Sequence, residues 1–285
     1  MDLFNTLQKT VLIDYDIIAY RCGFASETRK YLVDDKTFDY KSEALTVSDD
    51  ISVLIAPEPL SNALQSAKHL CQTILDRLSP VESYRGYLTG KGNFRNDIAT
   101  IKPYKGNRKD ASKPFWFNEI RQYLVDHWNA EVTEGIEADD KLCIEFNKNP
   151  KNSVIVSIDK DFNQIPYVNL FNFVKNELIH VSPFTACKNF YTQMLTGDTV
   201  DNIQGCKGIG PAKAAKMLEP CKDANQCIAV CQEQYKKSYA NEWKKAWDEH
   251  YQLLKLLDKE LSKFGILHSA KEYEGKHSDK LTGKE

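Results

Sequence analysis

Short apolar runs that end in acidic residues alternate along this chain with segments of helical periodicity. The run TVLI leads directly into Asp14 and Asp16, and SVIVSI leads into Asp159 and Asp161. Such runs are typical of buried central strands, and strands that alternate with helices predict an α/β fold with a mostly parallel sheet covered on both faces. Because ligands of these sheets collect at the carboxyl ends of the strands, we expect the acidic residues to surround one cleft.

The chain divides by composition into three parts. We predict an α/β core over residues 1–182 with a basic loop around 90–113, a helical region over 183–270 and a charged tail over 271–285. The loop is rich in Gly and Lys and is predicted to be a mobile lid. Residues 25–50 are predicted to be a polar insertion, and the following DISVLIAP a strand or the start of a helix.

Composition narrows the class of protein. The 38 Lys and Arg residues oppose 40 Asp and Glu residues, which gives a formal net charge of −2, so a nucleic-acid partner would have to be met through a local basic patch. The eight cysteines form no CxxC pair, and no zinc framework is visible. We see no signal peptide and no apolar run of the roughly 18 residues that a membrane span needs. We therefore expect a cytoplasmic protein with reduced thiols and no membrane partner.

Four acidic clusters stand out as candidate metal ligands. They consist of Asp14; Glu137, Asp139 and Asp140; Asp159 and Asp161; and Asp198 and Asp201. Carboxylates gathered in one cleft repel each other unless cations are present, and oxygen ligands without His or Cys favour Mg²⁺ or Mn²⁺ over zinc. Each cluster alone could equally be a helix cap. Asp139 can join its two neighbours in one site only if the segment begins before the helix does, since on a helix it points elsewhere.

The basic loop carries the opposite charge. Residues 101–113 hold five basic residues and one acid, whereas residues 131–140 hold five acids and no base. Lys102, Lys105 and Arg108 would meet the phosphates of a polyanionic substrate, and Tyr104 in the same stretch could stack on bases. The alternative is a solvated charged loop.

The segment IQGCKGIGPAKAAKML joins a glycine turn to a helix. Gly208 and Gly210 allow a tight turn, and the free N–H groups at the start of the following helix can hold a phosphate, with Lys213 adding charge. The pattern matches a helix-hairpin-helix element that grips a DNA backbone without reading its sequence. An ordinary loop remains the alternative.

With these motifs in order over about residues 10–220, the chain resembles the flap endonuclease and 5′-3′ exonuclease family, and most closely the exonucleases of T-odd bacteriophages. The resemblance implies a central mixed sheet, an arch over the active site, a helix-hairpin-helix and two divalent metal ions, Mg²⁺ or Mn²⁺. By this resemblance Asp14 and the trio in GIEADD hold the first metal, and the pairs in SIDKDF and TGDTVDN hold the second. Many relatives place a further aspartate where this chain has Thr89 or Gly90, whereas Asp16 is additional here.

The resemblance also assigns residues to the substrate. Lys105 and Arg108 in YKGNR match the arch residues that contact the scissile phosphate, and Arg21 matches an arginine that follows the first aspartate. The GIGPAK hairpin resembles one that in relatives often holds K⁺. A family member would cleave phosphodiesters of double-stranded DNA from or near 5′ ends, flaps or RNA:DNA hybrids, as in phage-type replication, primer removal or host DNA degradation. We expect a monomer.

Two other functions remain open at this level. LIDYD and TGDTVDN also resemble motifs of haloacid-dehalogenase-like phosphatases, in which Asp14 would be the covalent nucleophile. That alternative leaves EADD, YKGNR and the glycine hairpin unexplained. A non-catalytic DNA-binding module gives no reason for eight clustered carboxylates.

Overall fold

A six-stranded sheet forms the centre of the molecule. The structure, a computed structural model, describes residues 9–108 and 112–259, so the predicted charged tail lies outside the described residues. The strands lie in the order β6 (Ala130–Val132), β5 (Val81–Leu88), β1 (Lys9–Asp14), β7 (Ser153–Val156), β8 (Asn169–Asn172) and β9 (Glu177–His180). All neighbouring pairs are parallel except β8 and β9, which form an antiparallel hairpin. The predicted mostly parallel sheet is thereby confirmed.

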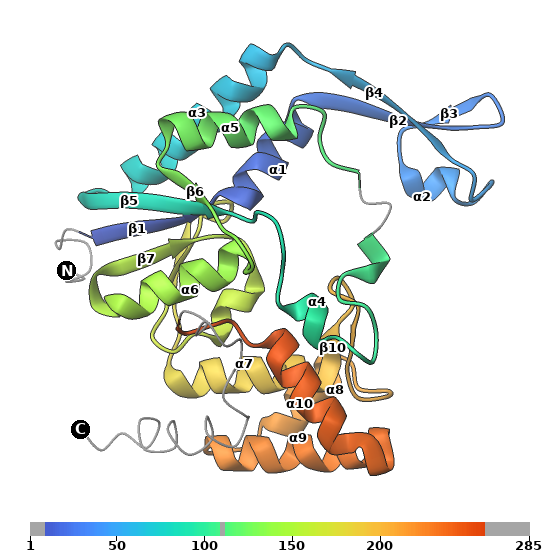
Figure 1. Cartoon of the computed structure of the whole chain (residues 1–285), viewed down its shortest axis with the longest axis vertical. Helices are drawn as coiled ribbons and strands as arrows, with labels where there is room; N and C mark the ends of the chain where they lie inside the picture. Colours follow the sequence, from blue (N-terminus) through green and yellow to red (C-terminus); the bar gives the residue numbers. More distant parts are fainter. Residues whose placement is uncertain (1–8, 109–111, 260–285) are drawn as a thin grey trace.

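Helices cover both faces of this sheet (Figure 1). One face packs against α1 (Tyr15–Ala25), α3 (Leu60–Arg77) and α5 (Phe117–His127), and the other packs against α6 (Ala138–Lys148). Alternate residues of β1 belong to the two cores: Val11 and Ile13 face the first set of helices, and Leu12 faces α6. Because both faces are buried, the consecutive residues 11–13 of β1 and 154–156 of β7 are all apolar rather than alternating with polar residues.

The predicted polar insertion is a folded element. It contains β2 (Glu27–Val33), β3 (Lys36–Phe38), α2 (Lys41–Ala44) and β4 (Ser52–Pro57). The three strands form a separate antiparallel sheet in the order β3-β2-β4, which extends away from the central sheet (Figure 1). The apolar run of β4 is exposed along its whole length. The sequence pattern was ambiguous here because strand pairing, not burial, stabilises these residues.

Residues 90–108, part of the predicted mobile lid, form local structure with two buried side chains, and their mobility stays a prediction. This stretch includes α4 (Arg95–Ile98) and the 3₁₀ turn η2 (Gly106–Arg108), and the side chains of Arg95 and Tyr104 are 2% and 8% exposed. Acidic groups pair with Arg95, Lys105 and Arg108, so a polar composition did not require all of these side chains to be exposed to solvent. The carboxylate of Glu249 also holds this stretch, accepting hydrogen bonds from the backbone N–H groups of Thr100 and Ile101 at 3.0 and 2.8 Å.

The described residues after residue 182, 183–259, are mostly helical, as predicted. It consists of α7 (Pro183–Thr196), α8 (Pro211–Leu218), α9 (Ala224–Tyr239) and α10 (Trp243–Leu254). Between α7 and α8, two strands of two residues each, β10 (Gly197–Asp198) and β11 (Ile203–Gln204), pair with each other. The 3₁₀ turn η5 (Ala240–Glu242) joins α9 to α10, whereas the 3₁₀ turns η3 (Pro150–Asn152) and η4 (Lys160–Gln164) lie earlier in the chain, before and after β7. These helices enclose a separate hydrophobic core around Tyr235 and Trp247. That core supports the domain boundary near residue 182, which stays a prediction.

Two further properties concern the described residues as a whole. The eight cysteines, all within the described part of the chain, are free thiols. Within the ranges 9–108 and 112–259, the helices are too short or too polar to cross a bilayer.

Candidate active site

Asp14 and Asp159 meet at the carboxyl ends of the central strands β1 and β7. The hydroxyl of Ser157 donates a hydrogen bond to Asp14 Oδ2 at 2.9 Å and accepts one from the backbone N–H of Asp159 at 3.0 Å. Asp14 also caps α1 through the N–H of Ile17 and is only 6% exposed. Burial, with smaller contributions from Asp16 and Asp159, raises the pKa of Asp14 to about 7.

The acidic trio lies at the start of α6. Glu137 is the N-cap residue, so it precedes the first helical turn and can turn toward Asp139 and Asp140. Carboxylate oxygens of the three side chains lie within 4.8 Å of one another. The condition set by the sequence is met, since the segment does begin before the helix.

The three members of the trio have different surroundings. Asp140 is fully buried and forms a two-pronged ion pair with Arg95 at 2.5 and 2.8 Å. Burial alone would raise the pKa of Glu137, but the cations of Lys105 and Arg95 outweigh it and hold that pKa below the usual value. Burial and the neighbouring Asp140 and Glu137 raise the pKa of Asp139 well above its usual value. Asp139 is therefore the member whose charge is least compensated.

A second acidic group faces the trio from the other side. Gln193 on α7 donates hydrogen bonds to Asp161 Oδ1 at 3.0 Å and to Asp198 Oδ2 at 3.5 Å, which holds the two carboxylates together. Burial and repulsion from Asp159 and Asp198 raise the pKa of Asp161 to about 7. Asp198 Oδ1 accepts hydrogen bonds from the N–H groups of Val200 and Asp201, which fixes the turn that carries this group.

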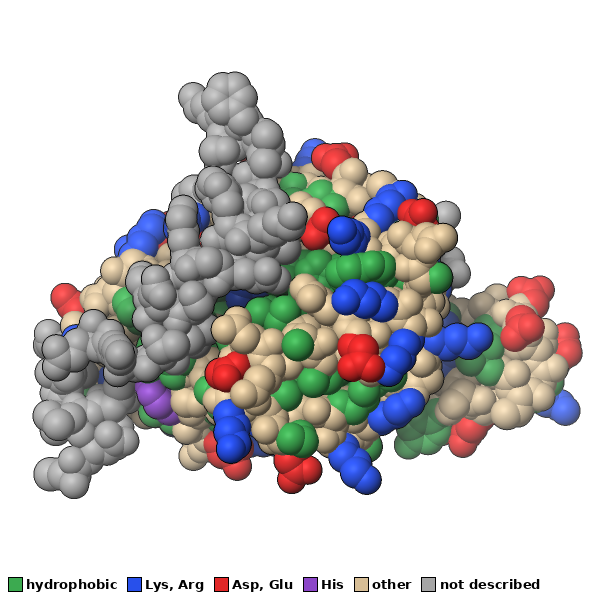
Figure 2. All heavy atoms as spheres, turned by 90° about the horizontal axis from the view of Figure 1, so that it is seen from below, with side chains coloured by type: hydrophobic (Ala, Val, Ile, Leu, Met, Phe, Trp, Pro, Cys, Tyr) green, Lys and Arg blue, Asp and Glu red, His purple; other side chains and the backbone are tan. Residues whose placement is uncertain are grey.

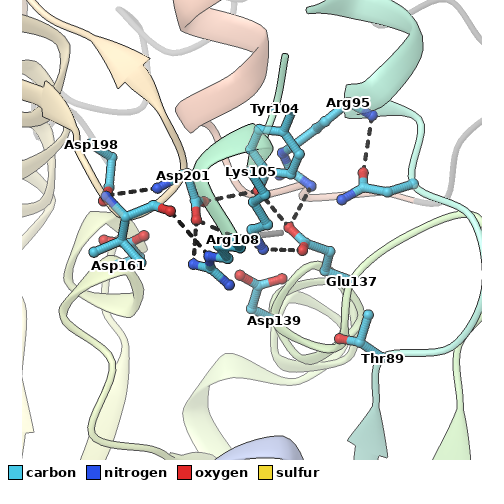
Figure 3. A network of polar contacts seen from close by, with 12 residues as sticks. Thr89, Arg95, Tyr104, Lys105, Arg108, Glu137, Asp139, Asp161, Asp198 and Asp201 are labelled. Carbon is cyan, nitrogen blue, oxygen red and sulfur yellow. Dashed lines mark hydrogen bonds and ion pairs between the residues drawn. The ribbon is translucent and has the colours of Figure 1, made fainter. Parts of the chain in front are cut away.

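The YKGNR segment joins the two acidic groups (Figure 3). The Tyr104 hydroxyl lies 2.7 Å from Glu137 Oε2 and 2.9 Å from Asp201 Oδ2, and the ammonium of Lys105 pairs with Glu137. Arg108 Nη2 lies 2.6 Å from Asp201 Oδ1. Lys105 has a φ of +53°, a left-handed conformation that costs a non-glycine residue energy, and its N–H bonds to the carbonyl of Asp201 at 2.9 Å. The backbone thus holds both cations over the carboxylates.

Members of the trio and of the second acidic group line a small cavity from opposite sides. Its lining includes Glu137, Asp139, Asp161 and Asp201. Their ligand atoms are all oxygens, and the pKa values raised by burial and repulsion mark negative charge that a divalent cation would neutralise. The residues present therefore fit Mg²⁺ or Mn²⁺.

The glycine hairpin lies beside this site. Gly208 has a φ of +72°, and Gly210 is the N-cap of α8, where Pro211 starts the helix. The ammonium of Lys213 donates to the carbonyl of Gly208 at 3.2 Å. Lys102 and Gly208 line the same open groove of about 430 Å³, so the structure brings the basic loop and the hairpin together.

Other sequence candidates have different surroundings. Tyr104 is buried and hydrogen bonded, which corrects the expectation that its ring is presented for base stacking. Arg21 is exposed on α1. Asp16 pairs with Arg121 at 2.5 Å and accepts from the N–H of Thr89 at 2.8 Å. The hydroxyl of Thr89 accepts a hydrogen bond from the backbone N–H of Ala138 at the start of α6. Thr89 therefore helps to fix the segment that carries the trio, although its side chain has no charge.

Sequence reasoning missed three polar residues of the site: Arg95, Ser157 and Gln193. Arg95 lies in a stretch assigned to solvent, Ser157 lies inside an apolar strand run, and Gln193 lies within an otherwise ordinary amphipathic helix. None belongs to a spaced motif, because each acts through a partner distant in sequence. Only their proximity to the acidic residues in the fold reveals them.

Comparison with known proteins gives sequence relatives among DNA-processing enzymes. No family model matches the chain. A DNA polymerase I of Rhizobium leguminosarum is 35% identical over 150 residues, which cover 47% of this chain and 14% of the polymerase. A 5′-3′ exonuclease of Mycoplasmopsis pulmonis is 29% identical over 166 residues, which cover 52% of this chain and 54% of the exonuclease. Flap endonucleases named Xni match as well. The match thus spans less than two thirds of the length of each of these relatives.

A solved structure supports the fold. A mutant of the T5 5′-exonuclease superposes with a TM-score of 0.50 at 13% sequence identity, covering 88% of each chain. At this identity the likeness concerns the fold alone. The predicted resemblance to the flap endonuclease and 5′-3′ exonuclease family is therefore confirmed, in sequence by the curated relatives and in fold by the T5 enzyme.

Proposed function

We propose that this chain is a divalent-metal-dependent 5′-3′ nuclease that hydrolyses phosphodiester bonds of DNA from or near 5′ ends. One observation carries the proposal: two groups of buried or partly buried carboxylates face each other across a cavity, and Lys105 and Arg108 pair with carboxylates of its lining. Carboxylates with no His or Cys among them suit hard divalent cations, and basic side chains beside them suit a phosphate. The 5′-3′ exonuclease relative and the flap endonucleases support the same reaction.

The acidic residues would hold two Mg²⁺ or Mn²⁺ ions. Asp14, Glu137 and Asp139 would serve the first ion, and Asp159, Asp161, Asp198 and Asp201 the second. When bound, the metals would supply Lewis-acid activation of water and stabilisation of charge on the phosphate. Asp161 and Asp14, with pKa values near 7, become better ligands as the pH rises through neutrality, because only the deprotonated carboxylate binds metal.

Lys105 and Arg108 would orient and neutralise the substrate phosphate. In the structure both cations pair with carboxylates that we assign to metal, namely Glu137 and Asp201. Their side chains are 27% and 42% exposed, so they can exchange these partners for a phosphate, while a bound metal would neutralise the carboxylates that they leave. Tyr104 would remain as the neutral hydrogen-bond donor between the two acidic groups.

The DNA partner would extend from the cavity to the glycine hairpin. We assign backbone binding to Lys102, Lys213 and the N–H groups around Gly208 and Gly210, as a helix-hairpin-helix would provide. Exposed lysines continue over the helical region on α8, α9 and α10, where Lys and Arg side chains are spread over the face shown in Figure 2. We propose that duplexes with 5′ ends, flaps and RNA:DNA hybrids are the candidate substrates, that K⁺ is a candidate ligand of the hairpin carbonyls, and that the protein acts as a monomer in DNA replication.

The phosphatase alternative has no support. Its second aspartate would be Asp16, which instead bonds Arg121 and the backbone of Thr89. Both carboxylate oxygens of Asp14 accept hydrogen bonds, one from the backbone N–H of Ile17 and one from the hydroxyl of Ser157. A carboxylate held in this way suits a fixed metal ligand better than a nucleophile. The relatives described above are nucleases and a DNA polymerase.

A paired assay tests the reaction class. We expect Mg²⁺-dependent short products from 5′-labelled blunt, nicked and flap duplexes, and no release of nitrophenol from p-nitrophenyl phosphate. The distribution of products among the three duplexes would assign exonuclease or flap preference. Hydrolysis of the phosphomonoester without cleavage of DNA would contradict the proposal and favour the phosphatase.

A further inference from the structure

The guanidinium of Arg95 is a deeply buried cation beside the site. Its side chain is 2% exposed and donates four hydrogen bonds: two to Asp140, one to the carbonyl of Leu253 at 2.9 Å and one to the carbonyl of Lys255 at 3.0 Å. The Asp140 carboxylate raises the pKa of Arg95 despite its burial, so the guanidinium stays charged. The pair therefore connects the start of the basic loop, the start of α6 and the segment after α10.

Asp140 has no accepting capacity left over. A carboxylate offers about four lone-pair sites. In Asp140 these sites accept two hydrogen bonds from Arg95, one from the N–H of Leu257 at 3.0 Å and one from the N–H of Glu137 at 3.4 Å. A metal bound here would have to displace at least one of these donors. It would also leave a buried guanidinium with weaker compensation, which is strongly unfavourable.

The other two members of the trio remain available. Glu137 is bonded to Tyr104 and to the partly exposed Lys105, and its Oε2 also lies 3.6 Å from Nη1 of Arg95. Asp139 Oδ1 accepts a hydrogen bond from the backbone N–H of Asp140 at 2.8 Å. Both line the cavity, together with Arg95, whereas Asp140 lies behind them.

We infer that Asp140 does not bind metal and instead acts with Arg95 as a positioning pair, which fixes the start of α6 so that Glu137 and Asp139 face the metal. This assignment departs from the prediction for Asp140, which rested on the resemblance alone. It depends on the proposed function only in taking Glu137 and Asp139 as metal ligands. The pair also makes the segment 253–257 part of the support of the site, because three of its backbone groups bond Arg95 or Asp140.

Mn²⁺ binding and thermal unfolding separate the two roles of an aspartate in the trio. We would count bound Mn²⁺ by electron paramagnetic resonance at saturating metal without DNA, and measure the melting temperature in EDTA. Asp140→Asn should keep the wild-type number of Mn²⁺ ions and melt lower, because Arg95 loses its counter-charge. Combining it with Arg95→Met should recover part of the melting temperature, since the unpaired cation is removed. Asp139→Asn should lose one Mn²⁺ without melting lower.

A matched control is available in Glu249, a buried acid that holds Thr100 and Ile101 of the same loop. Glu249→Gln should melt lower and keep all Mn²⁺, which shows that destabilisation alone does not remove metal. Loss of one Mn²⁺ in Asp140→Asn, or an unchanged melting temperature, would overturn the inference. A wild type that binds no Mn²⁺ would instead contradict the proposed function, and the melting temperatures would still test the pair.

If Asp140→Asn does not fold, the wild-type protein crystallised with Mn²⁺ decides the question. We expect anomalous peaks beside Glu137 and Asp139 with both Arg95–Asp140 hydrogen bonds intact. A peak bonded to Asp140 with Arg95 displaced would overturn the inference.

Discussion

Acidic residues that look alike in the sequence differ in the structure in their burial and in the partners of their carboxylates. Burial and repulsion from neighbouring carboxylates raise the pKa values of Asp14 and Asp161 to about 7, and the side chains that donate hydrogen bonds to them, Ser157 and Gln193, are neutral. Asp140 is fully buried but has a cation as its partner. At the scale of the residue, a neutral donor marks a carboxylate that gains from a metal, and a buried cation marks one that is already neutralised.

Asp14→Asn tests this distinction through pH. The pKa of Asp14 rises from 3.8 to about 7 in the folded protein, so between these values the folded state keeps a proton that the unfolded state has released. The wild type without metal therefore loses stability as the pH rises from about 4 to about 7. Asp14→Asn should be more stable than wild type at pH 8, by up to about 4 kcal/mol, and no more stable at pH 4.

Urea unfolding in EDTA at pH 4 and pH 8 measures the difference. Asp223→Asn is the control, because Asp223 is an exposed cap of α9 far from the acidic groups along the chain. If the wild type were more stable than Asp14→Asn at pH 8, burial of the ionised Asp14 carboxylate would not destabilise the folded protein, which would contradict the prediction.

Lys105→Ala should slow cleavage more than it weakens binding. If Lys105 neutralises charge that grows on the phosphate, its loss should reduce the single-turnover rate by about a hundredfold. Lys102→Ala is the contrast, since Lys102 lies at the groove and should affect affinity but not the rate at saturating DNA. Equal single-turnover rates for Lys105→Ala and wild type would exclude this role.

Residue identities were predictable where chemistry repeats in a pattern. The acidic clusters, Lys105 and Arg108 follow strands or form compact motifs, and the structure brings them to one cavity or its immediate surroundings. Arg95 could not be assigned, because a lone arginine in a basic loop resembles any solvated charge until its partners at 140, 253 and 255 are known.

At the scale of the element, the central sheet could be predicted from sequence because its strands are buried on both faces and are rich in apolar residues. The small sheet could not be predicted, because strand pairing and not burial stabilises it. β7 is buried at each of its four residues, whereas each residue of β4 is exposed. The burial of Arg95 in the loop 90–108 was not predicted for a related reason. Its charge is neutralised by Asp140 of α6, and Glu249 of α10 binds the backbone of the same loop, although both elements are distant in sequence. The amino-acid composition of a segment indicates how exposed such segments are on average, but it does not show which distant residues the segment contacts in the fold.

The hairpin before α8 offers a test with an internal control. Gly208 and Gly135 have φ values of +72° and +74°, and a Cβ at either position would meet no atom within 4 Å. Replacing either by Ala should cost about 1 kcal/mol of folding stability, because the conformation is left-handed. Only Gly208→Ala should weaken duplex binding measured with Ca²⁺ in place of Mg²⁺. Equal affinities of the two variants for duplex would remove the hairpin from the DNA-binding surface.

At the scale of the whole molecule, a net charge of −2 conceals two opposed surfaces. Acidic residues converge on the cavity, while lysines occupy the adjoining groove and the surface of the helical region. The overall charge could not predict this separation, since it depends on how the parallel sheet gathers its strand ends. Near-neutrality is therefore compatible with a nucleic-acid partner.

Cleavage of one 5′-labelled flap duplex over a Mg²⁺ titration tests the central claim most directly. The account predicts that wild type and Asp223→Asn yield short labelled products with Mg²⁺ and none in EDTA, and that Asp198→Asn yields none at any Mg²⁺ concentration while it still binds the duplex. Full Mg²⁺-dependent cleavage by Asp198→Asn, or cleavage by the wild type in EDTA, would contradict it.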